Sequence, residues 1–261
     1  MKNTSLKENL MRLLILSLFI SLIISSIALI VEKTPSKLSK IPTENFVSLR
    51  ITKSIVIEDC EYNHEECEDS LFMEGSTASG MVFGTNEKGE SLILTAGHFC
   101  ETIFGIPEGS ISPTLSLMFE TETILTVTDF YGAVWDAEIV DFDRSNDLCL
   151  VRSEMPSFRK LELSENMPDV GEEIYTISAP LSIRSDGAAP HFAGMFSGCD
   201  YSGICFFGIP AIFGSSGSLV LNSDYEIIGM IQMADPNFPV VGMGVGVEEI
   251  RDFLDKNKVI Y

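Results

Sequence analysis

Most of the chain consists of short apolar or alternating segments separated by clusters of turn residues. Residues 46–57 alternate between apolar and polar positions, as a half-buried strand does. Residues 92–94 and 148–151 are uninterrupted apolar runs, which favour buried strands. Turn clusters lie at 86–89, 185–187 and 222–224. This pattern predicts antiparallel β structure, and no internal repeat of short fixed period accompanies it.

The two ends of the chain have different patterns. Residues 13–31 form a run of 19 residues without a charge, long enough at about 1.5 Å per residue to cross a hydrocarbon core of about 30 Å. Residues 1–31 are therefore an uncleaved signal anchor, which the length favours, or a signal peptide cleaved after Ala28. Residues 32–45 are rich in Lys, Pro, Ser and Thr and predict a tether, so that the folded domain covers 46–261. Apolar positions 247, 250, 253 and 254 predict a terminal helix.

Three short segments carry candidate chemistry: Thr-Ala-Gly-His at 95–98, Asn-Asp-Leu at 146–148 and Gly-Ser-Ser-Gly-Ser at 214–218. A serine hydroxyl is a poor nucleophile until an imidazole takes its proton, and a carboxylate must hold that imidazole in the right tautomer. We therefore predict His98 as the base and Asp147 as the residue that orients it. Ser216 is the predicted nucleophile.

The glycines around Ser216 have a separate predicted role. A tight turn there can aim the backbone N–H groups of Gly214 and Ser216 at one point, where the oxyanion of a tetrahedral intermediate would sit. The small residues Ala96 and Gly97 likewise allow the close backbone approach that a catalytic ring at His98 requires. Ser216 and Asp147 are weak signals when taken alone, and Thr-Ala-Gly-His at the end of an apolar strand is a stronger one; the three residue types in this order indicate a serine protease.

From about Gly75 to Asp255 the chain resembles the trypsin/chymotrypsin superfamily, and above all its high-temperature-requirement, or Deg-type, protease domains. Segments that resemble the family's strands follow one another in order at 79–83, 137–143, 170–177, 194–198, 226–230 and 242–245. The resemblance implies an all-β fold of two six-stranded antiparallel β-barrels with a C-terminal helix, after an N-terminal hydrophobic helix. The first barrel is expected at about 46–160 and the second at about 161–261.

The resemblance also implies a serine endopeptidase that forms an acyl-enzyme intermediate. Ser215 stands where trypsin-like zymogens carry an aspartate, so activation by a newly cut N-terminus is not expected. Pro210 occupies the position that selects basic side chains in trypsins, so a preference for Lys or Arg is not expected. The residues expected to bind substrate are Phe213, Ile231, Gln232 and Met233. With Met243 they favour small-to-medium apolar P1 residues.

Two alternatives to an active protease stay open. The fold could serve as a catalytically inactive module that binds peptides or a protein partner. The second alternative is a latent enzyme whose cleft is distorted until a ligand orders the oxyanion loop, with residues 209–213 as the switch. The family implies polypeptide substrates and no cofactor, and it leaves a homo-oligomer open because Deg-type enzymes are often trimers.

Six cysteines behind an export signal indicate a compartment in which disulfides persist. The protease domain is therefore expected outside the cytosol, anchored in the membrane through the N-terminal segment or secreted. Two local bridges are predicted, Cys60–Cys67 and Cys199–Cys205. Cys100 and Cys149 either pair with each other or leave Cys149 as a buried thiol. A zinc site at Cys60, His64 and Cys67 is disfavoured, because the remaining ligand is not evident.

The charge balance excludes one class of partner. The chain has 17 basic and 38 acidic residues, a net charge of −21. Phosphate backbones need Lys and Arg to neutralise them, so a nucleic-acid partner is not expected. Docking on anionic lipid is disfavoured for the same reason.

Overall fold

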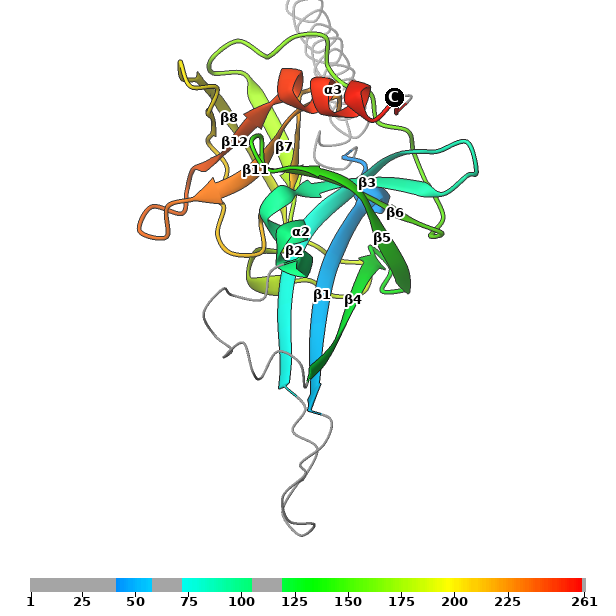
Figure 1. Cartoon of the computed structure of the whole chain (residues 1–261). Helices are drawn as coiled ribbons and strands as arrows, with labels where there is room; N and C mark the ends of the chain where they lie inside the picture. Colours follow the sequence, from blue (N-terminus) through cyan, green and yellow to red (C-terminus); the bar gives the residue numbers. More distant parts are fainter. Residues whose placement is uncertain (1–40, 58–71, 105–118, 260–261) are drawn as a thin grey trace, which may run out of the picture. The chain divides into compact units, whose positions relative to one another are not determined.

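The computed structural model describes residues 41–57, 72–104 and 119–259, and within them the backbone closes into two antiparallel barrels (Figure 1). The first barrel contains β1 (Phe46–Ile57), β2 (Phe72–Thr85), β3 (Ser91–Ala96), β4 (Phe119–Asp129), β5 (Val134–Asp143) and β6 (Leu148–Ser153). The second contains β7 (Glu173–Ile177), β8 (His191–Cys199), β9 (Cys205–Phe207), β10 (Leu219–Leu221), β11 (Ile227–Ala234) and β12 (Gly242–Gly246). The predicted all-β fold of two six-stranded barrels is confirmed.

The two barrels share one strand order. It is β1-β2-β3-β6-β5-β4 in the first and β7-β8-β9-β12-β11-β10 in the second. Each barrel is closed by a pairing between strands distant in sequence, β1 with β4 and β7 with β10. Closure removes the exposed edges that an open sheet would leave for aggregation.

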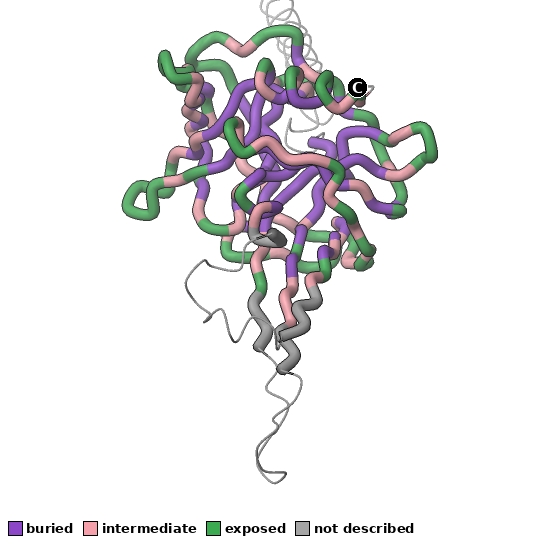
Figure 2. Tube along the Cα trace, viewed as in Figure 1, coloured by how far each residue is buried: buried purple, intermediate pink, exposed green. Residues whose placement is uncertain are grey.

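The uninterrupted apolar runs are explained by burial on both faces of a strand. Ile93 of β3 and Val151 of β6 belong to the core inside the first barrel, whereas their neighbours Leu94 and Leu150 belong to a core shared by both barrels. A third core fills the second barrel. A strand whose two faces meet different cores loses the apolar–polar alternation of a half-exposed strand. Figure 2 shows the buried backbone concentrated where the barrels meet.

The predicted terminal helix is present as α3 (Val247–Lys256). Its four apolar residues at the predicted positions, Val247, Ile250, Phe253 and Leu254, are buried. Three of them, Ile250, Phe253 and Leu254, join the core shared by the barrels. Glu248 and Glu249 in the first turn and a lysine in the last match the helix dipole.

Two disulfides lie among the described residues. Cys199–Cys205 joins β8 to β9, as predicted, and Cys100–Cys149 also forms, with a Cα–Cα distance of 6.4 Å. Cys149 is therefore not a free thiol. The second bridge connects α2 (Gly97–Phe104) to β6 inside the first barrel.

Several sequence predictions fall outside the described residues. These are the apolar segment at 13–31, the tether up to residue 40, and Cys60, His64 and Cys67. Among the residues that the structure describes, no helix is both long enough and apolar enough to span a membrane.

Candidate active site

His98 lies in the first turn of α2, immediately after β3. The preceding glycine is required by close contact with the turn that carries Asp147. A Cβ atom on Gly97 would lie 2.8 Å from the carbonyl carbon of Asp147 and 2.9 Å from the nitrogen of Leu148. The Gly97 N–H donates to the Asp147 carbonyl at 2.9 Å. The small residues before His98 thus let these two segments pack backbone against backbone, as the sequence predicted.

Asp147 holds the His98 imidazole by one ring nitrogen. Its Oδ2 and Oδ1 atoms lie 2.9 and 3.1 Å from His98 Nδ1, and Oδ1 also accepts the His98 backbone N–H at 2.5 Å. An ionised carboxylate only accepts hydrogen bonds, so Nδ1 carries the proton and Nε2 keeps a free lone pair. Asp147 adopts a left-handed φ of 52°, which Asp tolerates better than most residues.

The same contact changes the titration of the ring. The hydrogen bond with Asp147 raises the pKa of His98 above its ordinary value of 6.5, and the charges of Asp147 and Glu101 act in the same direction. Partial burial opposes this shift but does not cancel it. The imidazolium form is therefore stabilised, which is what a base needs once it has taken a proton.

Ser216 lies in a tight loop between two glycines with positive φ, Gly214 at 88° and Gly217 at 86°. A Cβ atom on Gly217 would lie 2.1 Å from the carbonyl oxygen of Ser79, so only glycine fits there. Ser215 closes the loop through Ile212. Its N–H donates to the Ile212 carbonyl at 2.8 Å and its Oγ accepts the Ile212 N–H at 3.3 Å.

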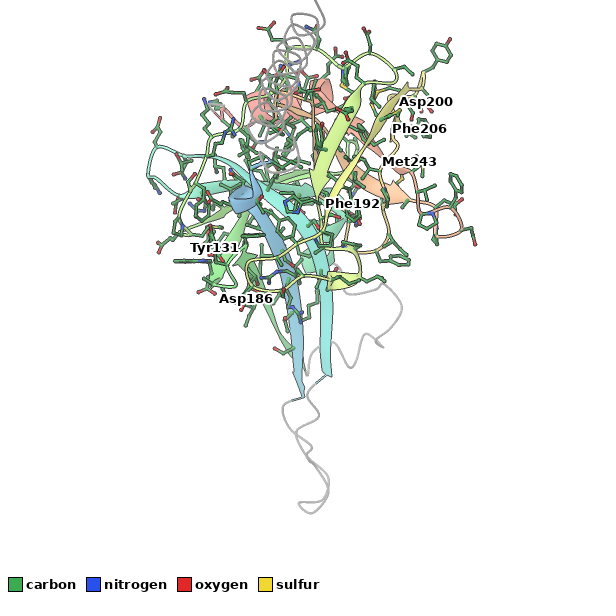
Figure 3. All side chains as sticks on the ribbon, turned by 180° about the vertical axis from the view of Figure 1, so that it is seen from behind. Tyr131, Asp186, Phe192, Asp200, Phe206 and Met243 are labelled. Carbon is green, nitrogen blue, oxygen red and sulfur yellow. A yellow bond between two sulfur atoms is a disulfide. The ribbon has the colours of Figure 1, made fainter. Side chains whose placement is uncertain are left out.

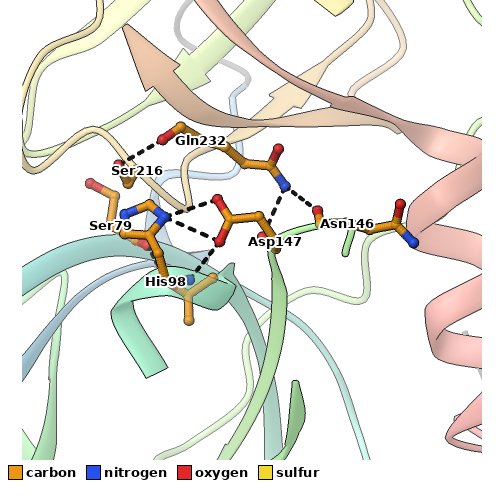
Figure 4. Close-up of polar contacts among 7 residues, drawn as sticks. Ser79, His98, Asn146, Asp147, Ser216 and Gln232 are labelled. Carbon is orange, nitrogen blue, oxygen red and sulfur yellow. Dashed lines mark hydrogen bonds and ion pairs between the residues drawn. The ribbon is translucent and has the colours of Figure 1, made fainter. Parts of the chain in front are cut away.

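The hydroxyl of Ser216 is close to the imidazole but bonded elsewhere. Figure 4 shows the ring of His98 between Ser216 and Asp147. Ser216 Oγ donates to the carbonyl of Gln232 at 3.1 Å, and within the described part of the chain it has no hydrogen bond to His98. Catalytic hydrogen bonds are often long or poorly aligned in structures without a bound substrate.

His98 and Ser216 both line a cleft of about 380 Å³. All four residues predicted to bind substrate line it too, as does Met243, which pairs with Phe206 across β12 and β9 (Figure 3). The other lining residues are Ala211, Ile212, Ser215, Ala234 and Pro236. Apart from His98, no ionisable side chain of the described residues lines the cleft.

Two polar residues at this site were not predicted in the roles that the structure gives them. Gln232, which is expected to bind substrate, lines the cleft, and its buried side-chain amide also donates to the carbonyls of Asn146 and Asp147 at 2.6 and 2.9 Å. It therefore ties β11 of the second barrel to the turn that carries the carboxylate. Ser79, on β2, is fully buried and contacts the loop around Ser216. For Gln232 the sequence signal is a single polar residue in the otherwise apolar strand β11, whereas Ser79 lies among other polar residues of β2 and carries no such signal.

Comparisons with known proteins agree with this geometry. A family model described as "Trypsin-like peptidase domain" matches residues 78–230, which include His98, Asp147 and Ser216. No curated protein matches the sequence significantly. Among solved structures, the chain is similar to the serine endoprotease from Yersinia pestis, with a TM-score of 0.57 and 14% sequence identity. That alignment covers 86% of this chain and 67% of the other, and at this identity the likeness is one of fold.

Proposed function

The chain belongs to the trypsin-like peptidase family, and from this premise we propose that it is a serine endopeptidase with His98, Asp147 and Ser216 as its catalytic triad. One observation carries the proposal: Asp147 holds Nδ1 of His98 at 2.9 Å while Ser216 lines the same cleft as the ring. Only this arrangement leaves Nε2 free to take the serine proton.

In the proposed reaction, Ser216 Oγ attacks the carbonyl carbon of the scissile peptide while His98 Nε2 takes the hydroxyl proton. The carbonyl oxygen becomes an oxyanion, and the N–H groups of Gly214 and Ser216 bind it. Neither N–H has an acceptor among the residues described, which supports this role. His98 then returns the proton to the leaving amine, and water releases the acyl group by the same steps.

The free enzyme must first reorient the nucleophile. The Ser216 hydroxyl has to leave the Gln232 carbonyl and point toward Nε2 of His98, which a side-chain rotation achieves. The bond to Gln232 is also the observation that favours the alternative of a latent enzyme. A single labelling experiment separates the two.

Reaction of the full chain with a fluorophosphonate probe tests the proposal. We expect one adduct, located on Ser216 by mass spectrometry, because the probe needs a serine that a neighbouring base activates. Labelling should be lost in Ser216→Ala and strongly reduced in His98→Ala. It should persist in Ser223→Ala, which removes an exposed serine from a distant turn. A folded protein that takes no label is latent or inactive, and label that remains in Ser216→Ala contradicts the triad.

The lining of the cleft supports apolar P1 specificity. A peptide library should be cleaved after small-to-medium apolar residues, because burying a charged side chain beside Ile212, Ile231 and Met243 leaves it unpaired. Met243→Asp should add cleavage after Lys and Arg by supplying the missing counter-charge. Cleavage by the wild type mainly after charged residues would exclude this specificity.

The location of the protein belongs to the same proposal. The two disulfides of the described residues support a protease domain that works outside the cytosol. Residues 13–31 then act as its membrane anchor or export signal.

A further inference from the structure

Ser79 lies where the two barrels and the loop around Ser216 meet. Ser79 is on β2 and has no exposed surface. It comes two residues before Met81, where the pairing of β2 with β3 starts. Its N–H donates to the Ser216 carbonyl at 2.9 Å, and its carbonyl accepts from Thr95 Oγ1 at 2.8 Å. A polar residue buried so completely is expected to have its hydrogen bonds satisfied.

The hydroxyl of Ser79 bonds to two segments that are far apart in the sequence, the loop at Gly214 and the segment that begins at Ala179. Ser79 Oγ donates to the Gly214 carbonyl at 2.7 Å and accepts the Ala179 N–H at 2.9 Å. Gly214 belongs to the loop of the proposed oxyanion hole, whereas Ala179 precedes the short 3-10 helix η3 (Pro180–Ser182). One hydroxyl serves both bonds only when the two segments lie in this one arrangement.

The segment at 179–182 in turn fixes the peptide unit that carries the proposed oxyanion donor. The Leu181 N–H donates to the Phe213 carbonyl at 2.7 Å, and this carbonyl shares a peptide plane with the Gly214 N–H. Rotating that peptide would break the bond to Leu181 and turn the Gly214 N–H away. The fit is tight, because a Cβ atom on Gly214 would lie 2.6 Å from the Ala179 carbonyl.

The backbone of residues 179–182 is strained, and contacts from neighbouring segments must keep it in this conformation. Leu181 and Ser182 have φ values of 53° and 59°, in the left-handed region that residues other than glycine rarely adopt. Strained backbone of this kind persists only when surrounding contacts over-determine it. Ser79 provides such a contact from a rigid barrel strand.

We propose that Ser79 is a positioning residue for the oxyanion hole: its hydroxyl locks Gly214 and the 179–182 segment together, and so aims the Gly214 N–H at the reacting carbonyl. The proposal rests on the proposed endopeptidase function. Without the hydroxyl, the half-buried Gly214 carbonyl and the buried Ala179 N–H lose their partner, and both segments can move.

Ser79→Ala tests the role, with Ser91→Ala as its matched control. Ser91 is also fully buried in the first barrel, and its Oγ donates to the Met155 carbonyl at 2.8 Å, far in sequence from the loop. For Ser79→Ala we expect kcat to fall about 10²-fold with KM within about twofold, since the lost interaction forms only in the transition state. Affinity for a peptide boronate should fall by a similar factor, while affinity for the product peptide stays unchanged. Ser91→Ala should leave all four quantities unchanged.

Amide hydrogen exchange provides a readout that does not depend on catalysis. Exchange in peptides covering 211–217 should become faster in Ser79→Ala and stay unchanged in Ser91→Ala. Ser79→Cys keeps a side-chain donor at this position, although a weaker and slightly larger one, and it should give an intermediate effect; it replaces the alanine variant if that variant does not fold. An unchanged kcat, or equal exchange in both serine variants, overturns the role of Ser79. If the wild type takes no fluorophosphonate label, the endopeptidase proposal fails and hydrogen exchange alone decides the positioning.

Discussion

Replacing Asp147 with asparagine is expected to lower kcat/KM by about 10⁴-fold while the fold is kept, if the proposed triad operates. The carboxylate accepts from both the Nδ1 proton and the backbone N–H of His98. An amide cannot accept at both positions, because its nitrogen only donates. The imidazole then turns to the tautomer with the proton on Nε2, and the base has no free lone pair for Ser216.

We also expect Asp147→Asn to change how kcat/KM depends on pH. His98 must be neutral to accept a proton, so activity rises with pH through the pKa of the ring. Because Asp147 raises that pKa, we expect the acid limb of kcat/KM in the wild type above pH 6.5, and we expect it to move to lower pH in Asp147→Asn. The stability linked to His98 runs the other way: it is present below pH 6.5 and is lost as pH rises through the raised pKa.

The measurement is kcat/KM against pH for wild type, Asp147→Asn and Asp224→Asn. Asp224 is exposed in a turn that lies away from the cleft, so its replacement removes an equal charge without touching His98. Full activity in Asp147→Asn, or an acid limb that stays in place, means that the carboxylate does not orient the ring.

The sequence predicted those parts of the fold and the site that have local signals. Alternation over 46–57 matched β1, and the spacing of Ile250 and Phe253 matched the buried face of α3. His98 and Ser216 could be named as candidates because each is next to a glycine that the local backbone packing requires, Gly97 and Gly217, whereas Asp147 was named from its place in the order of the three segments. The double barrel itself came from the family resemblance, since the pairings that close each barrel leave no local pattern.

The roles of Ser79 and Gln232 could not be predicted for the same physical reason. Ser79 contacts Gly214 from 135 positions away, and Gln232 contacts Asp147 from 85 positions away. A buried hydroxyl or amide must have a partner, but only the packing of the two barrels identifies it. Each of the two residues belongs to one barrel and bonds to a segment of the other barrel. A site that lies between the barrels needs such contacts to keep its parts in place.

Removing the Cys100–Cys149 disulfide should lower the free energy of unfolding more than removing Cys199–Cys205. The first bridge spans 49 residues and the second 6. Because the closed loop restricts the unfolded chain, the expected losses are about 4 and about 2 kcal/mol, respectively. Each pair is replaced by two alanines, and unfolding in urea is compared with the wild type.

The first bridge should also affect catalysis, which the second should not. Cys100 lies two residues after His98 and Cys149 two residues after Asp147, so this disulfide joins the helix that carries His98 to the strand that follows Asp147. Both sulfur atoms lie in the core of the first barrel, and alanines there leave a cavity into which α2 can shift. We therefore expect lower kcat in Cys100→Ala/Cys149→Ala and wild-type kcat in Cys199→Ala/Cys205→Ala, both measured well below their unfolding midpoints. Equal effects of the two pairs on stability and on kcat would show that the effect of the first bridge is not specific to the His98–Asp147 contact.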